Sequence, residues 1–525
     1  MRMPSVMRHN FSQVPRADIP RSSFDRSHGY KTTLNAGALY PIFVDEALPG
    51  DTFNVNMTGF ARLSTPLKPI MDNAYFNTFF FSVPIRLIWE NWQRFNGEQS
   101  EPGDSTDYLV PEIVAGAGGF AAGSIYDYMG LPVGVPNIRI AAFHNRAYNL
   151  IWNEWFRDEN LQNTAGVHTG DGPDPDTYVL LRRGKRHDYF TSSLPWPQKG
   201  ESISIPLGSN APVVSTTWPT AAPSFFPGGN TSPPASFLYS GAGAGDQVLI
   251  DHATGPMPLA WDVPNLRADL TNATAASINQ LRQAFQVQKL YERDARGGTR
   301  YTEILRSHFG VTSPDQRLQR PEYLGGGQSD IQINPVAQTQ SSDPGTTPQG
   351  NLAAIGTSVM HGHGFSKSFT EHCVILGLIC IRADLTYQQG INRMWSRRGR
   401  FDYYWPALSH IGEQAVLNKE IYCDGTPDDE GVWGYQERYA EYRYKPSLIT
   451  GEFRSSHPQS LDVWHLSQDF TTRPHLNGTF IEENPPFDRV VAVPSEPTFI
   501  LDTYFRMRCA RPMPVYGVPG MIDHF

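Results

Sequence analysis

Two strongly alternating segments, one near each end of the chain, constrain the fold more than any other feature of this sequence. In residues 51–58, Phe53, Val55 and Met57 alternate with polar residues. In the second segment, one face carries Phe499, Leu501, Thr503, Phe505, Met507 and Cys509, and the other carries Asp502, Tyr504, Arg506 and Arg508. Alternation with a period of two indicates half-buried β-strands. The aromatic run 75–83 and the apolar run 374–381 predict two further strands.

Strands near both ends of the chain, with long excursions between them, favour one β-sandwich or barrel that carries insertions. Length alone would suggest about three to four domains. The composition of the 525 residues, with 46 Gly, 43 Pro, 12% aromatic and only 18% charged residues, favours strands joined by long loops. It excludes a helical bundle, a coiled coil, a collagen-like rod and a disordered chain.

Helical periodicity is confined to a few segments. Aromatic and aliphatic residues at helical spacing predict helices over residues 85–96, between Pro84 and Gly97, and over 141–160. Two more helices are expected at 278–297 and 301–309. The polar, Gly-rich residues 325–358 are expected to form a loop. The N-terminal residues, 1–40 in all, are expected to form an arm over a surface.

The middle of the chain has a different composition. Residues 202–245 contain no Asp, Glu, Lys or Arg, yet the segment is rich in Pro, Gly and aromatic residues. A disordered linker would carry more charge and fewer aromatic side chains. Residues 202–266 are therefore expected to form an ordered insertion that packs against something, with copies of itself as one option. The candidate contact residues there are Trp218, Phe225, Phe226, Phe237 and Tyr239.

The formal net charge of −9 excludes a chain coated in basic charge, although a local basic face remains open. Of 43 basic residues, 35 are Arg, which suits interfaces and phosphates. The basic stretches lie at 182–187, at 397–400 and at the C-terminal end, and aromatic and basic residues interleave over 435–454. Two interpretations stay open for each: a solvated face or salt bridges between subunits, or contact with single-stranded nucleic acid. Cross-strand pairing of Tyr with Arg would also explain 435–454.

No catalytic motif is present. The Gly-rich segments 116–123 and 241–246 lack the ending of a phosphate-binding loop, and there is no nucleophile elbow and no zinc-protease motif. His361 and His363 are expected as surface loop residues rather than metal ligands. The sequence therefore predicts no catalytic residue, no cofactor and no metal site. A β-sandwich carbohydrate-active enzyme and a single-stranded nucleic-acid-binding protein remain alternatives to a structural protein.

The four cysteines form no CxxC pair and are expected as free thiols. The N-terminal residues contain no apolar secretory segment, so the chain is expected to be made in a cytoplasm. The longest strongly apolar run, residues 374–381, is too short to span a bilayer, and no membrane insertion is expected.

Long runs of the sequence resemble the major capsid protein of microviruses, specifically the gokushovirus branch, which are small tailless bacteriophages with circular single-stranded DNA. These runs lie at 11–33, 47–53, 71–98, 143–162, 185–200, 291–311, 320–326, 377–408 and 511–520. They cover most of the chain except about 202–270 and the region near 330–358. Several long runs together are far more specific than any short motif.

The resemblance implies a structural protein with an eight-stranded antiparallel viral jelly roll that spans residues 1–525 and carries long insertions. Sixty copies would close a T=1 icosahedral shell with pentamers, and residues 202–270 would meet two symmetry copies as a protrusion on each threefold axis that contacts the host receptor. The implied partners are packaged single-stranded DNA, a small basic internal protein, a DNA pilot protein and a scaffolding protein. The virion, assembled in the cytoplasm of a bacterial host, is the implied location.

The charge placement along the sequence adds one hypothesis about DNA contact. Arg8, Arg506, Arg508 and Arg511 are candidates to face the packaged DNA. They come from the position of the charges and not from any residue of the resemblance.

Overall fold

The structure is a computed structural model that describes residues 20–197, 199, 278–312, 319–343 and 348–516, together with six short strands between residues 213 and 268. The chain divides into two compact units, residues 198–293 and the remainder. Trp218 and Arg8 lie outside the described residues. Each unit is described by itself.

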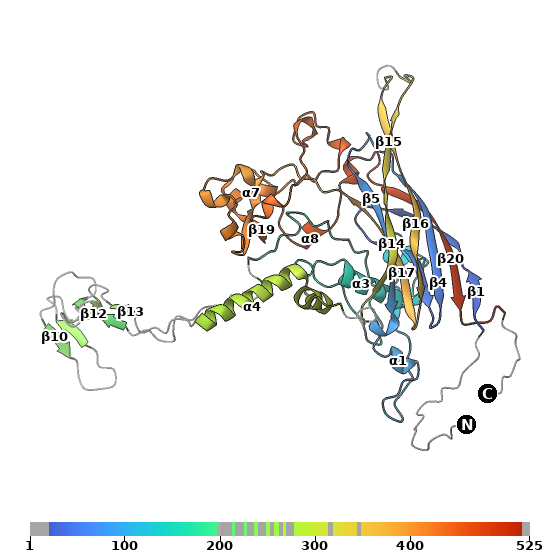
Figure 1. Ribbon diagram of the computed structural model, residues 1–525, viewed down its shortest axis with the longest axis horizontal. Coiled ribbons are helices and arrows are strands. Elements are labelled where there is room, and N and C mark those ends of the chain that lie inside the picture. The colour runs from blue at the N-terminus through green and yellow to red at the C-terminus, as the bar shows by residue number, and fades with distance from the viewer. Residues whose placement is uncertain are drawn as a thin grey trace. The chain divides into compact units, whose positions relative to one another are not determined.

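The larger unit is built around two antiparallel sheets (Figure 1). The first sheet has the order β1-β20-β4-β16-β15, with β2 also paired to β20, and the second has the order β14-β5-β17-β3. Their bounds are β1 Ser22–Asp25, β2 His28–Leu34, β3 Tyr40–Ala47, β4 Thr52–Leu63, β5 Ala74–Pro84, β14 Glu322–Asp330, β15 Gln332–Ala337, β16 Leu352–Ser368, β17 Cys373–Ala383 and β20 Phe499–Arg511. The mainly β, sandwich-like architecture agrees with the prediction from sequence.

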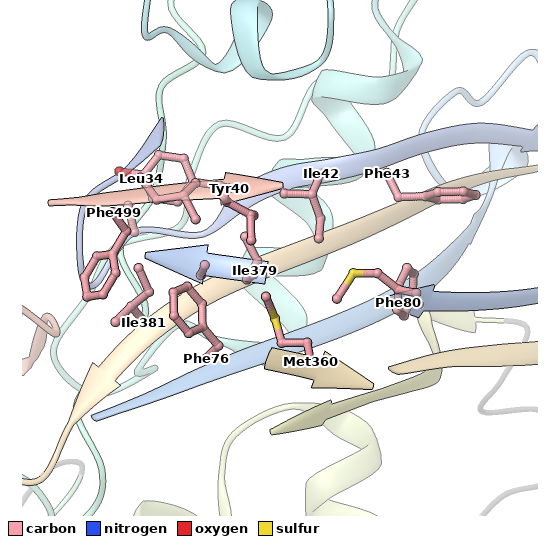
Figure 2. Packing of buried hydrophobic residues seen from close by; sticks show 14 of the residues in the cluster. Leu34, Tyr40, Ile42, Phe43, Phe76, Phe80, Met360, Ile379, Ile381 and Phe499 are labelled. Atoms are coloured by element: carbon pink, nitrogen blue, oxygen red, sulfur yellow. The ribbon is translucent and has the colours of Figure 1, made fainter. Parts of the chain in front are cut away.

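The two sheets pack face to face through aromatic side chains. Phe76 of β5 meets Phe499 of β20 with ring centroids 5.3 Å apart. Phe43 of β3 lies 5.2 Å from Phe505 of β20. Figure 2 shows Phe43, Phe76 and Phe499 together with aliphatic residues of the same core, such as Ile379 and Ile381. In β4 and β20 every second side chain is buried, so the faces predicted from the alternation are confirmed.

Strand β17 is buried along its whole length, as its apolar run over residues 374–381 requires. One face, which includes Ile375 and Ile379, belongs to the core between the sheets. The other face, which includes Leu376 and Leu378, packs in a second core. The helix α3 (Phe143–Trp155) contributes Tyr148, Ile151 and Trp152 to this second core. The helix predicted over 141–160 is therefore confirmed, with its aromatic stripe covering the second sheet.

The loop predicted over residues 325–358 is wrong, because most of this region forms β14, β15 and the start of β16. The glycines misled the prediction. A Cβ at Gly326 would lie 2.0 Å from the carbonyl oxygen of Thr78, and a Cβ at Gly327 would lie 2.4 Å from the ring of His363. Glycine is required at these two positions because atoms of neighbouring strands come very close to them, and not because the backbone turns there.

The helix predicted over 85–96 is also wrong as a continuous element. The chain forms one 3₁₀ turn, η1 (Ile85–Leu87), and one short helix, α1 (Trp92–Phe95). Between them Trp89 is fully buried, and its indole N–H donates to Asp171 Oδ1 at 2.7 Å. Packing of this one large side chain overrides the helical periodicity.

The two downstream helices are confirmed. Helix α4 spans Ile278–Gly297, and helical turns α5 (Tyr301–Ile304) and η2 (Leu305–Phe309) follow it. Gly310 ends them in the left-handed conformation, with φ of 68°.

Shorter elements of the larger unit surround a third core, which includes Tyr189, Trp433 and Phe480. They are β18 Glu413–Leu417, α7 Asn418–Ile421, β19 Val432–Glu437 and α8 Gly478–Ile481, with β6 Glu112–Val114, α2 Ile125–Tyr128 and β7 Arg139–Ala141 elsewhere in the unit. The remaining ordered turns are 3₁₀ helices of three or four residues, η3 to η10, between Arg393 and Arg489.

The smaller unit contains a four-stranded sheet of order β10-β11-β12-β9 and the pair β13-β8. The bounds are β8 Val213–Ser215, β9 Phe225–Pro227, β10 Ser236–Tyr239, β11 Val248–Asp251, β12 Met257–Trp261 and β13 Leu266–Ala268. Four of the candidate contact residues lie in these strands, namely Phe225 and Phe226 in β9 and Phe237 and Tyr239 in β10.

A buried ion pair connects α3 to the segment that contains Asp174. Arg146 donates from Nη2 and Nε to the two carboxylate oxygens of Asp174 at 2.6 and 2.8 Å, and both side chains are almost fully buried. Burial alone would raise the pKa of Asp174, but hydrogen bonds from Arg146 and Tyr178 outweigh it and lower the pKa overall. Removing the guanidinium would leave a buried carboxylate without its counter-charge.

Arg146→Met is therefore expected to lower the free energy of unfolding by about 3–5 kcal/mol, as for other broken buried pairs. The matched control is Arg139→Met, because Arg139 pairs with Glu112 at 2.8 Å on the surface with 69% of its side chain exposed. That change should cost less than about 1 kcal/mol. Denaturant unfolding followed by tryptophan fluorescence measures both, and equal effects would contradict the structural role of the buried pair.

Candidate nucleic-acid interface

The outer face of the first sheet presents polar and basic side chains in register. Arg506 and Arg508 of β20 are exposed, and they lie opposite Asn56 and Asn54 of β4. The strand alternation that buries Phe505 and Met507 turns both guanidinium groups to the same outward face. Two candidate residues are thus brought together on one surface, which we call the β4–β20 face.

The charges of Arg506 and Arg508 are not neutralised by an ion pair with any residue that the structure describes. The carboxylate of Asp25, at the end of β1, lies opposite Arg508 and is affected by the charges of both arginines. Hydrogen bonds from Ser27 chiefly lower the pKa of Asp25, and the charges of Arg508 and Arg506 lower it further. The two guanidinium groups therefore keep their N–H donors available for an external anion.

Aromatic side chains lie on the same face. Tyr504 is 52% exposed and lies opposite Thr58, and Phe60 is 49% exposed and lies opposite both Asp502 and Val359. Exposed rings beside arginines on a sheet can stack on unpaired bases while the arginines contact phosphates. The β4–β20 face has the chemistry for single-stranded nucleic acid.

Arg511 is placed differently from the other two candidates. Its Nε donates to Asp51 Oδ2 at 3.0 Å, and its Nη2 donates to the carbonyl oxygen of Glu46 at 2.8 Å. Asp51 is fully buried, so this arginine holds the turn between β3 and β4. Its guanidinium is already engaged within the chain. Arg8 lies outside the described residues.

The other basic stretches make contacts within the chain. Arg397 pairs with Glu441 and lies 4.2 Å from the ring centre of Tyr442. Arg443 pairs with Glu437, so the interleaved segment 435–454 supplies internal ion pairs. In the stretch 182–187, Lys185 is buried and Arg183 is mostly buried against aromatic rings. The sequence pattern could not predict this burial, because residues 182–187 lie in no helix or strand whose periodicity would show a buried face.

Neither His361 nor His363 lies in a loop as predicted, because both belong to β16, and only His361 keeps the predicted surface position. His361 is exposed, but His363 is buried in β16, where its Nδ1 lies 2.8 Å from Thr78 Oγ1 and its Nε2 lies 3.1 Å from Ser329 Oγ. Burial lowers the pKa of His363. The surface position predicted for His363 is wrong, because a β-bulge between Met360 and His363 turns it inward. Within the described ranges, no three His, Cys, Asp or Glu side chains are grouped to hold a metal ion.

Comparison with known proteins decides between the structural and enzymatic alternatives. Residues 12–521 match the family model described as capsid protein (F protein). The chain belongs to this capsid protein family. It is 52% identical to capsid protein VP1 of Bdellovibrio phage phiMH2K, over 98% of each chain. It is 45% identical to capsid protein VP1 of Chlamydia phage 1, over 99% of each, and 37% identical to that of Spiroplasma virus 4, over 98% of this chain and 97% of the relative.

The predicted resemblance to microviral capsid proteins is confirmed by this membership. The protein is a structural capsid protein and not an enzyme, it self-assembles into a shell, and it resides in the virion. Over the residues that can be described, no helix combines the length and the apolar character needed to cross a membrane.

The β4–β20 face generates a test in virus particles. If this face contacts DNA, replacing Arg506 and Arg508 together with Ser should reduce the DNA content per particle, because each chain would offer two fewer cations to the phosphates. Arg511→Ser should instead lower thermal stability, since its partner Asp51 is left buried and unpaired. The ratio of absorbance at 260 and 280 nm and the melting temperature of purified particles separate the two effects. Unchanged DNA content in the double variant would remove this face as a DNA contact.

Proposed function

We propose that this chain is the repeating unit of a T=1 icosahedral shell of sixty copies that encloses a circular single-stranded DNA genome. The observation that carries the proposal is membership of the capsid family over residues 12–521. The relatives match this chain along nearly their whole length.

The sheet topology supports an eight-stranded jelly roll. The strands β2, β20, β4 and β16 lie in this order in one sheet, and β3, β17, β5 and β14 lie in this order in the other. Along the chain, successive strands alternate between the sheets except at β5 and β14, which pair within one sheet. This is the connectivity of two interlocked Greek keys. The long excursions after β5 and after β17 are then insertions into one domain that spans residues 1–525. The arm proposed over residues 1–40 is part of that domain and includes β1 and β2, which pair with β20.

Residues 202–270 are proposed as the insertion that forms a protrusion on each threefold axis and contacts the host receptor. The segment falls within the smaller compact unit, residues 198–293, which supports its independence from the sandwich. The absence of Asp, Glu, Lys and Arg from residues 202–245 supports packing at a symmetry axis, where like charges from three copies would repel one another. Trp218, Phe225, Phe226, Phe237 and Tyr239 are the residues proposed to make that contact.

The charge of the chain supports one of the remaining proposed partners. A protein of net charge −9 repels a polyanion, so a small basic internal protein is proposed to neutralise much of the packaged DNA. Arg8, Arg506, Arg508 and Arg511 would then supply local contacts rather than bulk neutralisation. A DNA pilot protein and a scaffolding protein complete the proposed assembly, which takes place in the cytoplasm of the bacterial host.

The number of copies is tested by the mass of purified particles. Sedimentation velocity and native mass measurement should show empty shells of sixty chains and pentamers as assembly intermediates. Because isolated chains can require a scaffold, particles from infected cells are the sample of choice. Particles built from another number of copies would contradict the proposed shell.

Deletion of residues 205–265, closed by a short Gly-Ser linker, tests the insertion. The sandwich should still fold and form shells, because none of its strands lies in the deleted segment. Image reconstruction of the shells should lack density on the threefold axes. A chain that no longer folds, judged by circular dichroism and limited proteolysis, would show that the segment is not an insertion.

A further inference from the structure

A pocket of about 600 Å³ lies on the side of the second sheet that faces away from the sandwich core. Phe79 and Phe81 of β5 and Tyr323 of β14 form its floor, and the chain after α3 and the extended residues 183–187 form its walls. The β4–β20 face lies on the opposite side of the sandwich. The pocket is therefore a separate site, and its volume is in the range that accommodates a small organic ligand.

The cations of this pocket outnumber the carboxylates available to them. Its lining includes Arg157, Arg183, Lys185, Arg186, Arg300 and Arg382 but only one acidic residue, Asp158. Three of these cations have partners: Arg186 pairs with Asp384, Arg382 with Glu483, and Arg300 with Glu159. The other three, Arg157, Arg183 and Lys185, form no ion pair with a described residue.

The unpaired cations are held rigidly. The extended segment is pinned by the backbone N–H of Arg183, which donates to Gly37 O at 2.9 Å, and by that of Lys185, which donates to Ile481 O at 2.7 Å. Residues two apart in an extended chain point to the same side. The Arg183 guanidinium donates once, to Asn77 Oδ1 at 3.2 Å, and lies 4.8 Å from the ring centre of Phe79.

The other two unpaired cations also retain donors. Arg157 donates from Nη1 to the carbonyl oxygen of Gln162 at 3.1 Å, while its buried Nε has no partner among the described residues. The ammonium of Lys185 lies 4.3 Å from the ring centre of Phe480, with no hydrogen bond to a described residue. Glu483 lies near enough to stabilise the charges of Arg183 and Lys185, but burial outweighs it and lowers the pKa of both. Because neither cation has a directly bonded carboxylate, an anion in the pocket would stabilise both charges.

Exposed aromatic rings border the cations. Tyr323 is 43% exposed and Trp155 is 38% exposed, with their ring centres 6.2 Å apart. Rings of this kind stack on planar heterocycles. A carboxylate from a second copy of the chain would satisfy the cations but would leave the rings uncovered.

We propose that this pocket binds a nucleoside phosphate, with the phosphate against Arg157, Arg183 and Lys185 and the base against Tyr323 and Trp155. The ligand can be a free nucleotide or one residue of a single strand, and both carry the same chemistry. The inference does not depend on the number of copies in the shell or on the role of the β4–β20 face.

Isothermal titration calorimetry of the full-length protein tests the site with four probes: dAMP, deoxyadenosine, inorganic phosphate and a ten-residue oligodeoxyadenylate without terminal phosphates. We expect dAMP to bind at least tenfold more tightly than either deoxyadenosine or phosphate alone. Tighter binding of dAMP than of the oligonucleotide would identify a free nucleotide, and the reverse order would identify a strand. Equal affinity for phosphate and dAMP, or no binding of any probe, would overturn the proposal.

Variants separate ligand binding from folding. Arg157→Gln, Arg183→Gln and Lys185→Met should each weaken dAMP binding at least fivefold, while the surface variant Arg139→Gln should leave it unchanged. Burial lowers the pKa of Lys185 to about 8, so at pH 7 the folded chain holds a charge that burial disfavours. Lys185→Met should therefore raise the melting temperature below about pH 8, and this gain should disappear as the pH rises from about 8 toward the ordinary lysine pKa.

A residue kept only for structure would lower both stability and binding when replaced. A lower melting temperature for Lys185→Met at pH 7, or an unchanged dAMP affinity, would therefore contradict the proposal. A reconstruction of assembled particles in which a neighbouring chain's carboxylate fills the pocket would also overturn it. If all three variants still form normal particles, a failure to bind dAMP as expected would count against the proposed pocket and not against the proposed shell.

Discussion

The burial of β17 on both faces is the constraint on which the larger unit depends. An apolar strand of this length can be stable only if a layer covers each face. On one side the first sheet supplies that layer, through contacts such as Phe43 with Phe505. On the other side α3 and its neighbours supply it, through Tyr148 and Trp152. The sandwich, the helix that covers it and the pocket beside that helix all follow from this arrangement.

Much of this architecture could be predicted from the sequence, because strand alternation is a local signal. The faces of β4 and β20 and the buried character of β17 follow directly from which residues are apolar. The errors arose where contacts distant in sequence decide the outcome. Gly326 and Gly327 are explained by Thr78 and His363, about 250 and 36 residues away, and no local pattern could reveal that approach.

The candidate sites show the same limit. Arg506 and Arg508 were identified from alternation on one strand, and the structure brings them together with Phe60 and Tyr504 through cross-strand register. Arg511 belonged to the same basic group in the sequence, yet its guanidinium holds Asp51. The unpaired charge of Lys185 was not visible at all, because burial of a polar segment depends on what packs around it. Charge placement thus identifies candidates, and tertiary partners decide which of them remain available.

A shell subunit must satisfy two demands that conflict within one chain: a closed apolar core and surfaces that stay reactive until assembly. This chain meets the first with the aromatic interior between its sheets and the second with exposed faces that carry unpaired arginines. A reconstruction of DNA-filled particles at a resolution that shows side chains tests this account most directly. The account predicts sixty chains per shell, with the β4–β20 face inward and genome density against Arg506 and Arg508. A reconstruction in which that face lies on the outer surface, or is buried between subunits, would contradict it.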